Sequence, residues 1–101
     1  MYVAMNHFRV NPERAADFEA AWRERKSYLD EVPGYREFHL LRGPEEDGAV
    51  LYASHTVWDD ETSFRAWTRS DAFHKAHAQG SVKDLLLGPP RFVGWTAVLR
   101  K

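Results

Sequence analysis

The sequence predicts an α+β fold with the element order β-α-β-β-α-β. Three observations lead to this prediction. Several segments alternate apolar and polar residues or are rich in β-formers, as strands do. Two segments between them repeat apolar residues at helical spacing. A length of 101 residues, of which 44% are hydrophobic, suits one packed domain over residues 1–101.

The first predicted strand runs from Tyr2 to Val10. Alternate residues place Tyr2, Ala4, Asn6, Phe8 and Val10 on one face and Val3, Met5, His7 and Arg9 on the other. Asn11 followed by Pro12 favours a helix start, because it pairs an N-cap side chain with a first-turn proline. The helical stripe then comprises Ala15, Phe18, Trp22 and Leu29. Pro33-Gly34 predicts the end of this helix.

A hairpin is predicted next. Its strands are expected at Tyr35 to Arg42 and Ala49 to Trp58, and the second is rich in β-forming residues. Between them, residues 43–48 (Gly-Pro-Glu-Glu-Asp-Gly) have the composition of a turn.

The second helical region is predicted to begin at Asp59-Asp60, with Phe64 and Trp67 one turn apart. Ser70-Asp71 could restart the helix for another turn or two. A loop with Gly88-Pro89-Pro90 precedes a last strand expected from Phe92 to Arg100. This order is the ferredoxin-like arrangement, one antiparallel sheet with both helices on one face.

The second face of the predicted sheet also needs cover, because neither set of alternate strand residues is fully polar. The apolar candidates on that face are Val3, Met5, Leu51, Ala53 and Val57. Two such sheets packed face to face would bury them. We therefore expect a homodimer with a barrel-like centre, a dimeric α+β barrel.

Composition excludes several classes of function. Fourteen basic and fifteen acidic residues leave no cationic surface typical of nucleic-acid binding. The absence of cysteine excludes thiolate metal sites and covalent haem attachment through Cys-x-x-Cys-His. No leader pattern or membrane-spanning stretch is evident, so we expect a cytoplasmic protein with no membrane partner.

Three residues are candidates for chemistry. Asn6 lies inside a predicted strand, where a buried amide is unfavourable unless it finds partners. Trp67 and His77 lie ten residues apart in one helical tract. An imidazole can ligate a metal, and an indole can form the wall of an apolar pocket. By themselves these residues could equally be a strand amide bonded to a loop, a core tryptophan and a surface histidine.

His74 offers a second imidazole one turn before His77, so either could be a ligand. With Asp71 they could form part of a zinc or non-haem iron site, although three ligands on one short helix are a weak pattern.

Asn6, the segment Phe64-Arg65-Ala66-Trp67 and the segment from Ser70 to His77 together resemble the antibiotic biosynthesis monooxygenase superfamily. Within it, the chain is most similar to the IsdG-type haem-degrading monooxygenases. The likeness covers nearly the whole chain, including Pro33-Gly34-Tyr35 and Leu40-Leu41-Arg42.

The resemblance implies a function and a set of roles. The function is a haem-degrading monooxygenase that opens the tetrapyrrole with O2 and releases iron, haem b being both substrate and cofactor. His77 would be the axial ligand of the haem iron, Asn6 would orient the oxygen species, and Trp67 would shape the macrocycle, with Phe73 also at the haem. Electrons would come from an external donor or reductase, because no nucleotide-binding glycine fingerprint is present.

Two alternatives remain open. One is a cofactor-independent monooxygenase of aromatic polyketide or quinol substrates, and the other is a non-catalytic dimer that binds haem or another ligand. Arg23 and Arg25 could reach haem propionates, but helical arginines are usually solvated and neither is assigned. The remaining histidines fall on predicted strands and could meet across the sheet or the dimer: His7, His39 and His55.

Overall fold

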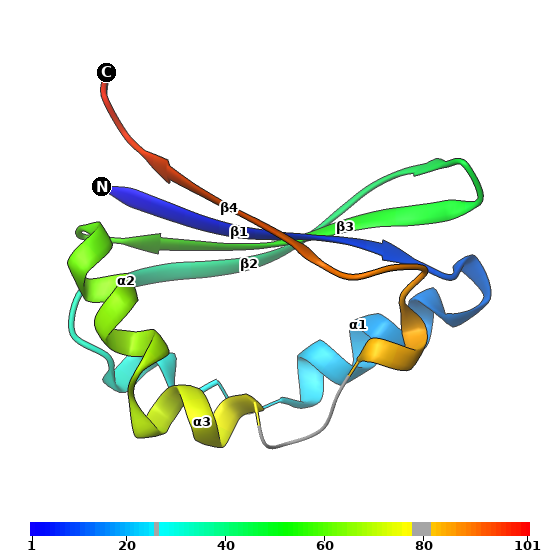
Figure 1. Ribbon diagram of the computed structural model, residues 1–101, viewed down its shortest axis with the longest axis horizontal. Coiled ribbons are helices and arrows are strands. Elements are labelled where there is room, and N and C mark those ends of the chain that lie inside the picture. Colours follow the sequence, from blue (N-terminus) through cyan, green and yellow to red (C-terminus); the bar gives the residue numbers. More distant parts are fainter. Residues whose placement is uncertain (26, 78–81) are drawn as a thin grey trace.

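A computed structural model describes residues 1–25, 27–77 and 82–101 of the chain. Its strands and α-helices are β1 (Tyr2–Val10), α1 (Ala15–Glu24), β2 (Tyr35–Glu46), β3 (Ala49–Trp58), α2 (Glu61–Thr68), α3 (Asp71–His77) and β4 (Arg91–Thr96). The strands form one antiparallel sheet in the order β2-β3-β1-β4. All three α-helices lie on one face of it (Figure 1). The predicted α+β ferredoxin-like fold is confirmed.

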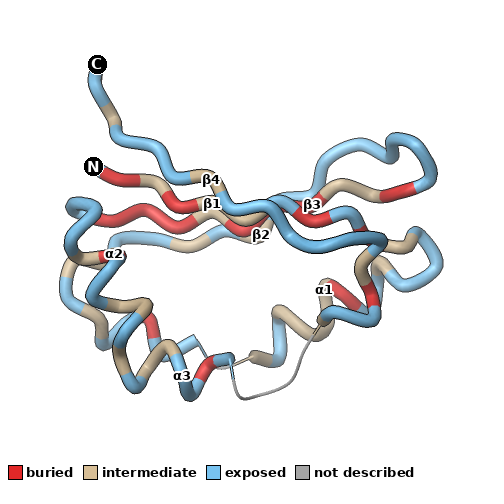
Figure 2. Tube along the Cα trace, viewed as in Figure 1, coloured by how far each residue is buried: buried red, intermediate tan, exposed pale blue. Residues whose placement is uncertain are grey.

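The alternation predicted for β1 is confirmed by burial. On the face that carries the helices, Tyr2, Ala4, Phe8 and Val10 are all buried. Asn6 lies on the same face and is only half-buried. Buried positions recur along the central strands β1 and β3, whereas no residue of β2 or β4 is buried (Figure 2).

The hairpin between β2 and β3 is tighter than the sequence predicted. Strand β2 continues to Glu46, so only Asp47 and Gly48 form the turn. Both have positive φ, 51° and 79°, as a two-residue turn with right-handed strand twist requires. Gly43 and Pro44 are therefore part of the strand, at a register shift between Arg42 and Glu45. Proline is tolerated there because β2 is an edge strand.

The first helical region is broken rather than continuous to Pro33. Asn11 caps it as predicted, since its Oδ1 accepts from the backbone N–H of Glu13 at 3.0 Å. Helix α1 ends at Glu24, and Leu29–Glu31 form a separate 3₁₀ turn. Gly34 precedes β2 instead of ending the helix, with φ of 85° and Ser63 too close for a Cβ. Among the described residues, no helix is long and apolar enough to cross a membrane.

The last strand is shorter than predicted. Strand β4 covers Arg91–Thr96, whereas the sequence suggested Phe92 to Arg100. Beyond the backbone hydrogen bond from Ala97 to Met1 the chain leaves the sheet, and the C-terminus lies apart from it (Figure 1). Val98 and Leu99 are consequently 93% and 71% exposed. A segment of strand-like composition forms a strand only where a neighbouring strand is available for hydrogen bonding.

Side-chain caps fix both helices that follow β3. Asp60 accepts from the backbone N–H of Ser63 at 2.7 Å and starts α2. Ser70 accepts from the N–H of Phe73 at 3.2 Å and donates to the carbonyl of Trp67 at 2.6 Å. Ser70 thus ends one helix and starts the next, as the sequence predicted. The arrangement sets the direction of α3 relative to α2.

The hydrophobic core between helices and sheet is divided into two clusters. The α2-side cluster contains Tyr2, Ala4, Leu29, Trp58 and Phe64. The α1-side cluster contains Phe8, Val10, Phe18, Tyr52 and Leu85. The strand registers place a row of residues across the sheet between them, here named the central row: Leu40, Ser54, Asn6 and Phe92. Two of its four side chains are polar, so the core is interrupted there.

Helix α1 is tied to the sheet by a buried phenol. The Tyr52 hydroxyl donates a hydrogen bond to Glu19 on α1, and Arg42 makes an ion pair with the same carboxylate at 3.2 Å. The hydrogen bond from Tyr52, followed by the charges of Arg42 and Arg23, holds the pKa of Glu19 below its usual range. This contact gives the buried hydroxyl a partner and fixes the face of α1 that carries Trp22.

We expect Asp60→Ala to lower the midpoint of thermal unfolding by roughly a few degrees Celsius, because α2 loses its cap. The backbone hydrogen bond from Ser63 lowers the pKa of Asp60, so the folded state holds this proton less tightly than the unfolded state. Its stabilisation is complete at neutral pH and disappears as pH falls through the lowered pKa. Thermal scans at pH 7 and pH 3 should therefore show the difference from wild type shrinking in acid.

Asp59→Ala is the matched control for the cap. Asp59 carries the same charge one residue earlier but makes an exposed ion pair with Arg36 instead of capping α2. Exposed ion pairs contribute little. An equal loss in both variants would contradict the capping explanation.

Candidate functional site

A cavity lies over the central row, between the two core clusters. It has two adjoining regions, of about 210 Å³ and about 600 Å³, and residues of the sheet line both. Six residues line both regions: Asn6, Trp22, Arg25, Phe64, Trp67 and His77. Small-molecule sites commonly have volumes of about 300 to 1,000 Å³ and apolar walls with a few polar groups. The cavity has that character.

His77, the last residue of α3, presents a defined ring nitrogen. Its Nδ1 lies 2.8 Å from the backbone carbonyl oxygen of Phe73. A carbonyl can only accept, so Nδ1 carries the proton and donates. In the neutral ring, the Nε2 lone pair is then available for a ligand, and a carbonyl partner of this kind is common behind metal-binding histidines. The ring also stacks on Phe73, with centroids 3.9 Å apart.

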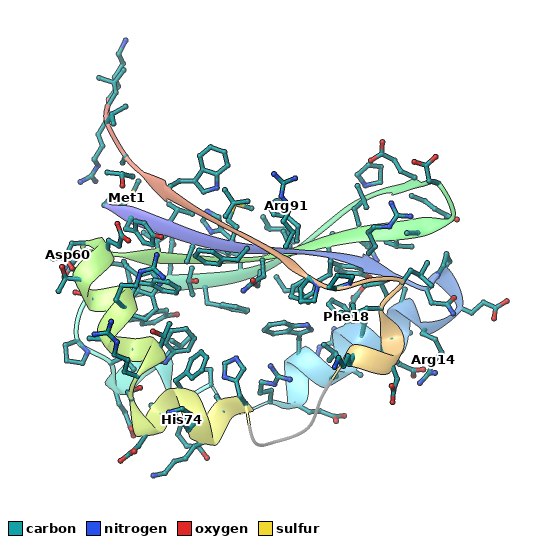
Figure 3. All side chains as sticks on the ribbon, viewed as in Figure 1. Met1, Arg14, Phe18, Asp60, His74 and Arg91 are labelled. Atoms are coloured by element: carbon teal, nitrogen blue, oxygen red, sulfur yellow. The ribbon has the colours of Figure 1, made fainter. Side chains whose placement is uncertain are left out.

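The two imidazoles of α3 are not equivalent. His77 lines both regions of the cavity, whereas His74 lines neither. His74 is exposed on α3, the helix that lies far from the sheet (Figure 3). Among the described residues, no three His, Cys, Asp or Glu side chains come together as a metal site, so the alternative built on Asp71, His74 and His77 finds no support.

Trp67 forms an aromatic wall on α2. It packs on Trp58 behind it with ring centroids 5.4 Å apart, and it meets Phe73 edge-on at 4.9 Å. Its ring centroid is 6.3 Å from that of His77. The indole Nε1 is buried and has no hydrogen-bond partner within the described part of the chain. Trp67 is thus both a core residue and a cavity wall.

Asn6 lies on the opposite side of the cavity from α3. It is in the middle of β1, paired with Ser54 on β3 and Phe92 on β4. No hydrogen bond joins its amide to any side chain that the structure describes, and both regions of the cavity reach it. The amide therefore faces the cavity rather than a loop, which was the alternative for a strand asparagine.

The fold brings together the four residues to which the resemblance assigned roles. Asn6, Trp67 and His77 line both regions, and Phe73 lines the larger one. They come from the sheet and from two different helices, so a molecule in the cavity would contact the amide from one side and the imidazole from the other.

Two residues that line the cavity were given no role from the sequence. One lies on α1 and the other at its C-terminal end. Trp22 borders both regions, and its Nε1 is buried without a partner among described residues. The guanidinium carbon of Arg25 lies 5.0 Å from the centre of the Trp22 ring. Burial lowers the pKa of Arg25, yet a guanidinium stays cationic at neutral pH. The apolar stripe of α1 marked Trp22 as buried but gave no sign that it borders a cavity.

Residues 1–79 match the family described as antibiotic biosynthesis monooxygenase. Three solved structures illustrate the structural likeness. The haem degrader MhuD from Mycobacterium tuberculosis, with two haems in its active site, has 24% identity and a TM-score of 0.78, covering 100% of this chain and 99% of that one. A mutant of MhuD with two manganese protoporphyrin IX molecules per active site has 22% identity and a TM-score of 0.80, with coverages of 100% and 98%.

The third structure is SnoaB, a cofactor-independent oxygenase from Streptomyces nogalater. It has 22% identity and a TM-score of 0.71, covering 98% of this chain and 94% of that one. At these identities the likeness establishes the fold, and the fold is shared by a haem degrader and by a cofactor-independent oxygenase.

Proposed function

Because the chain belongs to the antibiotic biosynthesis monooxygenase family, we propose that it is a haem-degrading monooxygenase. The observation that carries this proposal is the pairing of His77 with the cavity. Its Nδ1 is held by a backbone carbonyl, and its Nε2 is left for a ligand beside aromatic walls. Neutral imidazole is a common axial ligand of haem iron.

The residues around the cavity fit a planar, apolar group with an anionic edge. Trp22, Trp67 and Phe73 provide aromatic surface, and His77 would ligate the iron from the α3 side. Arg25 supplies a cation at the cavity, suited to a carboxylate such as a propionate. Bound haem would supply the iron that activates O2 and would itself be the molecule opened, with electrons from an external donor or reductase.

Two side chains would direct the reaction. Trp67 packs against Trp58, which supports its indole in place, and the indole would press on one part of the macrocycle. Asn6 faces the cavity from the sheet, opposite α3, and its amide can both donate and accept. It would orient the oxygen species by hydrogen bonding, while the surrounding aromatic residues exclude water.

A second candidate is a cofactor-independent monooxygenase of aromatic polyketide or quinol substrates. The amide of Asn6 favours it, because it faces the cavity without a hydrogen-bond partner among described residues and could bond the oxygen atoms of a phenol or quinone directly. In that case His77 would hold no metal.

We further propose that two copies pack through the helix-free face of the sheet, in the cytoplasm. Trp95 and Leu41 on that face are 55% and 43% exposed. His39 and His55 are cross-strand partners there with ring centroids 5.6 Å apart, whereas His7 lies opposite Ala53. Large apolar side chains exposed on one face are unfavourable in water, and a second copy of the chain would cover them.

The first experiment is a titration of the purified protein with haemin, following the Soret band, and then addition of ascorbate in air with catalase present. The proposal expects a saturable spectral shift with one haem per subunit, followed by loss of the Soret band. Absence of saturable binding would exclude haem and point to the phenolic substrates. Binding without decay would leave a haem-binding protein.

Replacing Asn6 by alanine separates binding from turnover. We expect Asn6→Ala to bind haemin within about threefold of wild type but to degrade it about a hundredfold more slowly, since removal of one oriented hydrogen-bonding group commonly costs a factor of this size. Single-turnover rates on the saturated protein measure this directly. A rate close to that of wild type would remove Asn6 from the reaction.

A further inference from the structure

The floor of the smaller cavity region carries a second polar side chain beside Asn6. Ser54 on β3 is the direct cross-strand partner of Asn6, and both belong to the central row. Ser54 is 6% exposed and lines the 210 Å³ region together with Asn6. Residues directly opposite in an antiparallel pair have Cβ atoms about 4.5 to 5.5 Å apart. The hydroxyl and the amide therefore face the same small space.

Ser54 differs from the neighbouring threonine in how its hydroxyl is satisfied. Thr56, two residues along β3 on the same face, donates to the backbone carbonyl of Ala4 at 3.2 Å. Ser54 makes no side-chain hydrogen bond to any described residue. Its Oγ is not fully buried, so a small molecule in the cavity can reach it. A buried polar group without a partner is unfavourable. Because Ser54 lines the cavity, we expect its hydrogen-bond partner there.

The smaller region has room for a water molecule next to these two side chains. A water molecule occupies about 30 Å³ in the liquid and bonds two to four polar groups when buried. The region has about 210 Å³, and Asn6 and Ser54 both line it without hydrogen-bond partners among the described residues. A hydroxyl and an amide can each donate or accept, so one molecule can bond both.

We propose that Asn6 and Ser54 together bind one ordered water, or a polar group of that size, on the sheet side of the cavity. Ser54 is then a positioning residue that holds the Asn6 amide in one orientation through this shared partner. The second part rests on the proposed function, because the group so positioned would face a haem held from the other side by His77. The water site itself requires no haem.

The water site is tested by crystal structures of the ligand-free protein, of Ser54→Ala and of Thr56→Val, at a resolution that shows ordered water. We expect a water about 2.7 to 3.2 Å from both Ser54 Oγ and the Asn6 amide. It should be lost in Ser54→Ala and kept in Thr56→Val, where the missing hydroxyl had an internal partner. No water between the two groups in the wild type would overturn the proposal.

The positioning role is tested with fluoride on the ferric, haemin-loaded protein. Fluoride is a small hydrogen-bond acceptor that binds haem iron, so its affinity reports donors on the sheet side. Ser54→Ala should lower fluoride affinity by about two- to tenfold, the range expected for one hydrogen bond. Ser54→Thr, which keeps the hydroxyl and suits a strand, should restore it. Haemin is titrated into each variant first, so that every fluoride constant refers to fully loaded protein.

The two tests distinguish the two proposals. Wild-type protein that binds no haemin would refute the proposed function, while the crystal structures would still decide the water site. Haemin binding with the same fluoride affinity in wild type and Ser54→Ala would refute the positioning role and leave the proposed function intact.

Discussion

His77→Ala is expected to weaken haemin binding by at least about 10- to 100-fold and to remove the spectrum of an imidazole-ligated haem. Loss of even an outer partner of a metal ligand commonly costs this factor, and here the ligand itself is removed. His77 is exposed and contributes its ring to the cavity rather than to either core cluster. The variant should therefore fold normally, so the loss can be assigned to ligation.

His74→Ala is the matched control, because it removes an imidazole from the same helix that does not border the cavity. It should bind haemin like the wild type, and added imidazole should restore the spectrum of His77→Ala. If His74→Ala were the weaker binder, the ligand would be His74 and α3 would have to turn when haem binds. Equal affinity in all three proteins would remove axial ligation by α3 from the proposal.

The strands and caps were predictable because they depend on local physical chemistry. The alternation of β1, the cap at Asn11 and the restart at Ser70 follow from side-chain period and hydrogen bonding within a few residues. The turn was misplaced because residues 43–48 all have turn composition, and only pairing with β3 shows that the strand passes through Gly43 and Pro44. Register is a property of two strands together.

Part of the site was also predictable from local physical chemistry. Asn6 was conspicuous because an amide is out of place in a strand, and it does border the cavity. Ser54 gave no such signal, since serine is unremarkable in a strand until register pairs it with Asn6. Trp22 read as an ordinary core residue. The division of the core into two clusters, which turns these residues into a cavity lining, is decided by the packing of helices on the sheet.

Trp58→Ala is expected to lower the free energy of unfolding by about 3 to 5 kcal/mol, the usual range for a buried large aromatic residue. Trp58 is fully buried, and its ring lies 5.9 Å from Tyr35, 5.8 Å from Phe64 and 5.4 Å from Trp67. A domain of this kind has a total stability of about 5 to 15 kcal/mol. Urea unfolding followed by circular dichroism should show the loss.

Trp58→Phe distinguishes packing from the indole N–H. The Nε1 of Trp58 is buried with no partner among described residues, so phenylalanine loses ring area but also removes an unsatisfied donor. We expect it to retain more than half of the stability that alanine loses. Because Trp58 supports Trp67 from behind, haem bound to Trp58→Phe should also be opened with less positional selectivity, measured from the product ratio. A loss below about 1 kcal/mol in Trp58→Ala would mean that α2 is held to the sheet by other contacts, and that the Trp67 wall does not depend on the core behind it.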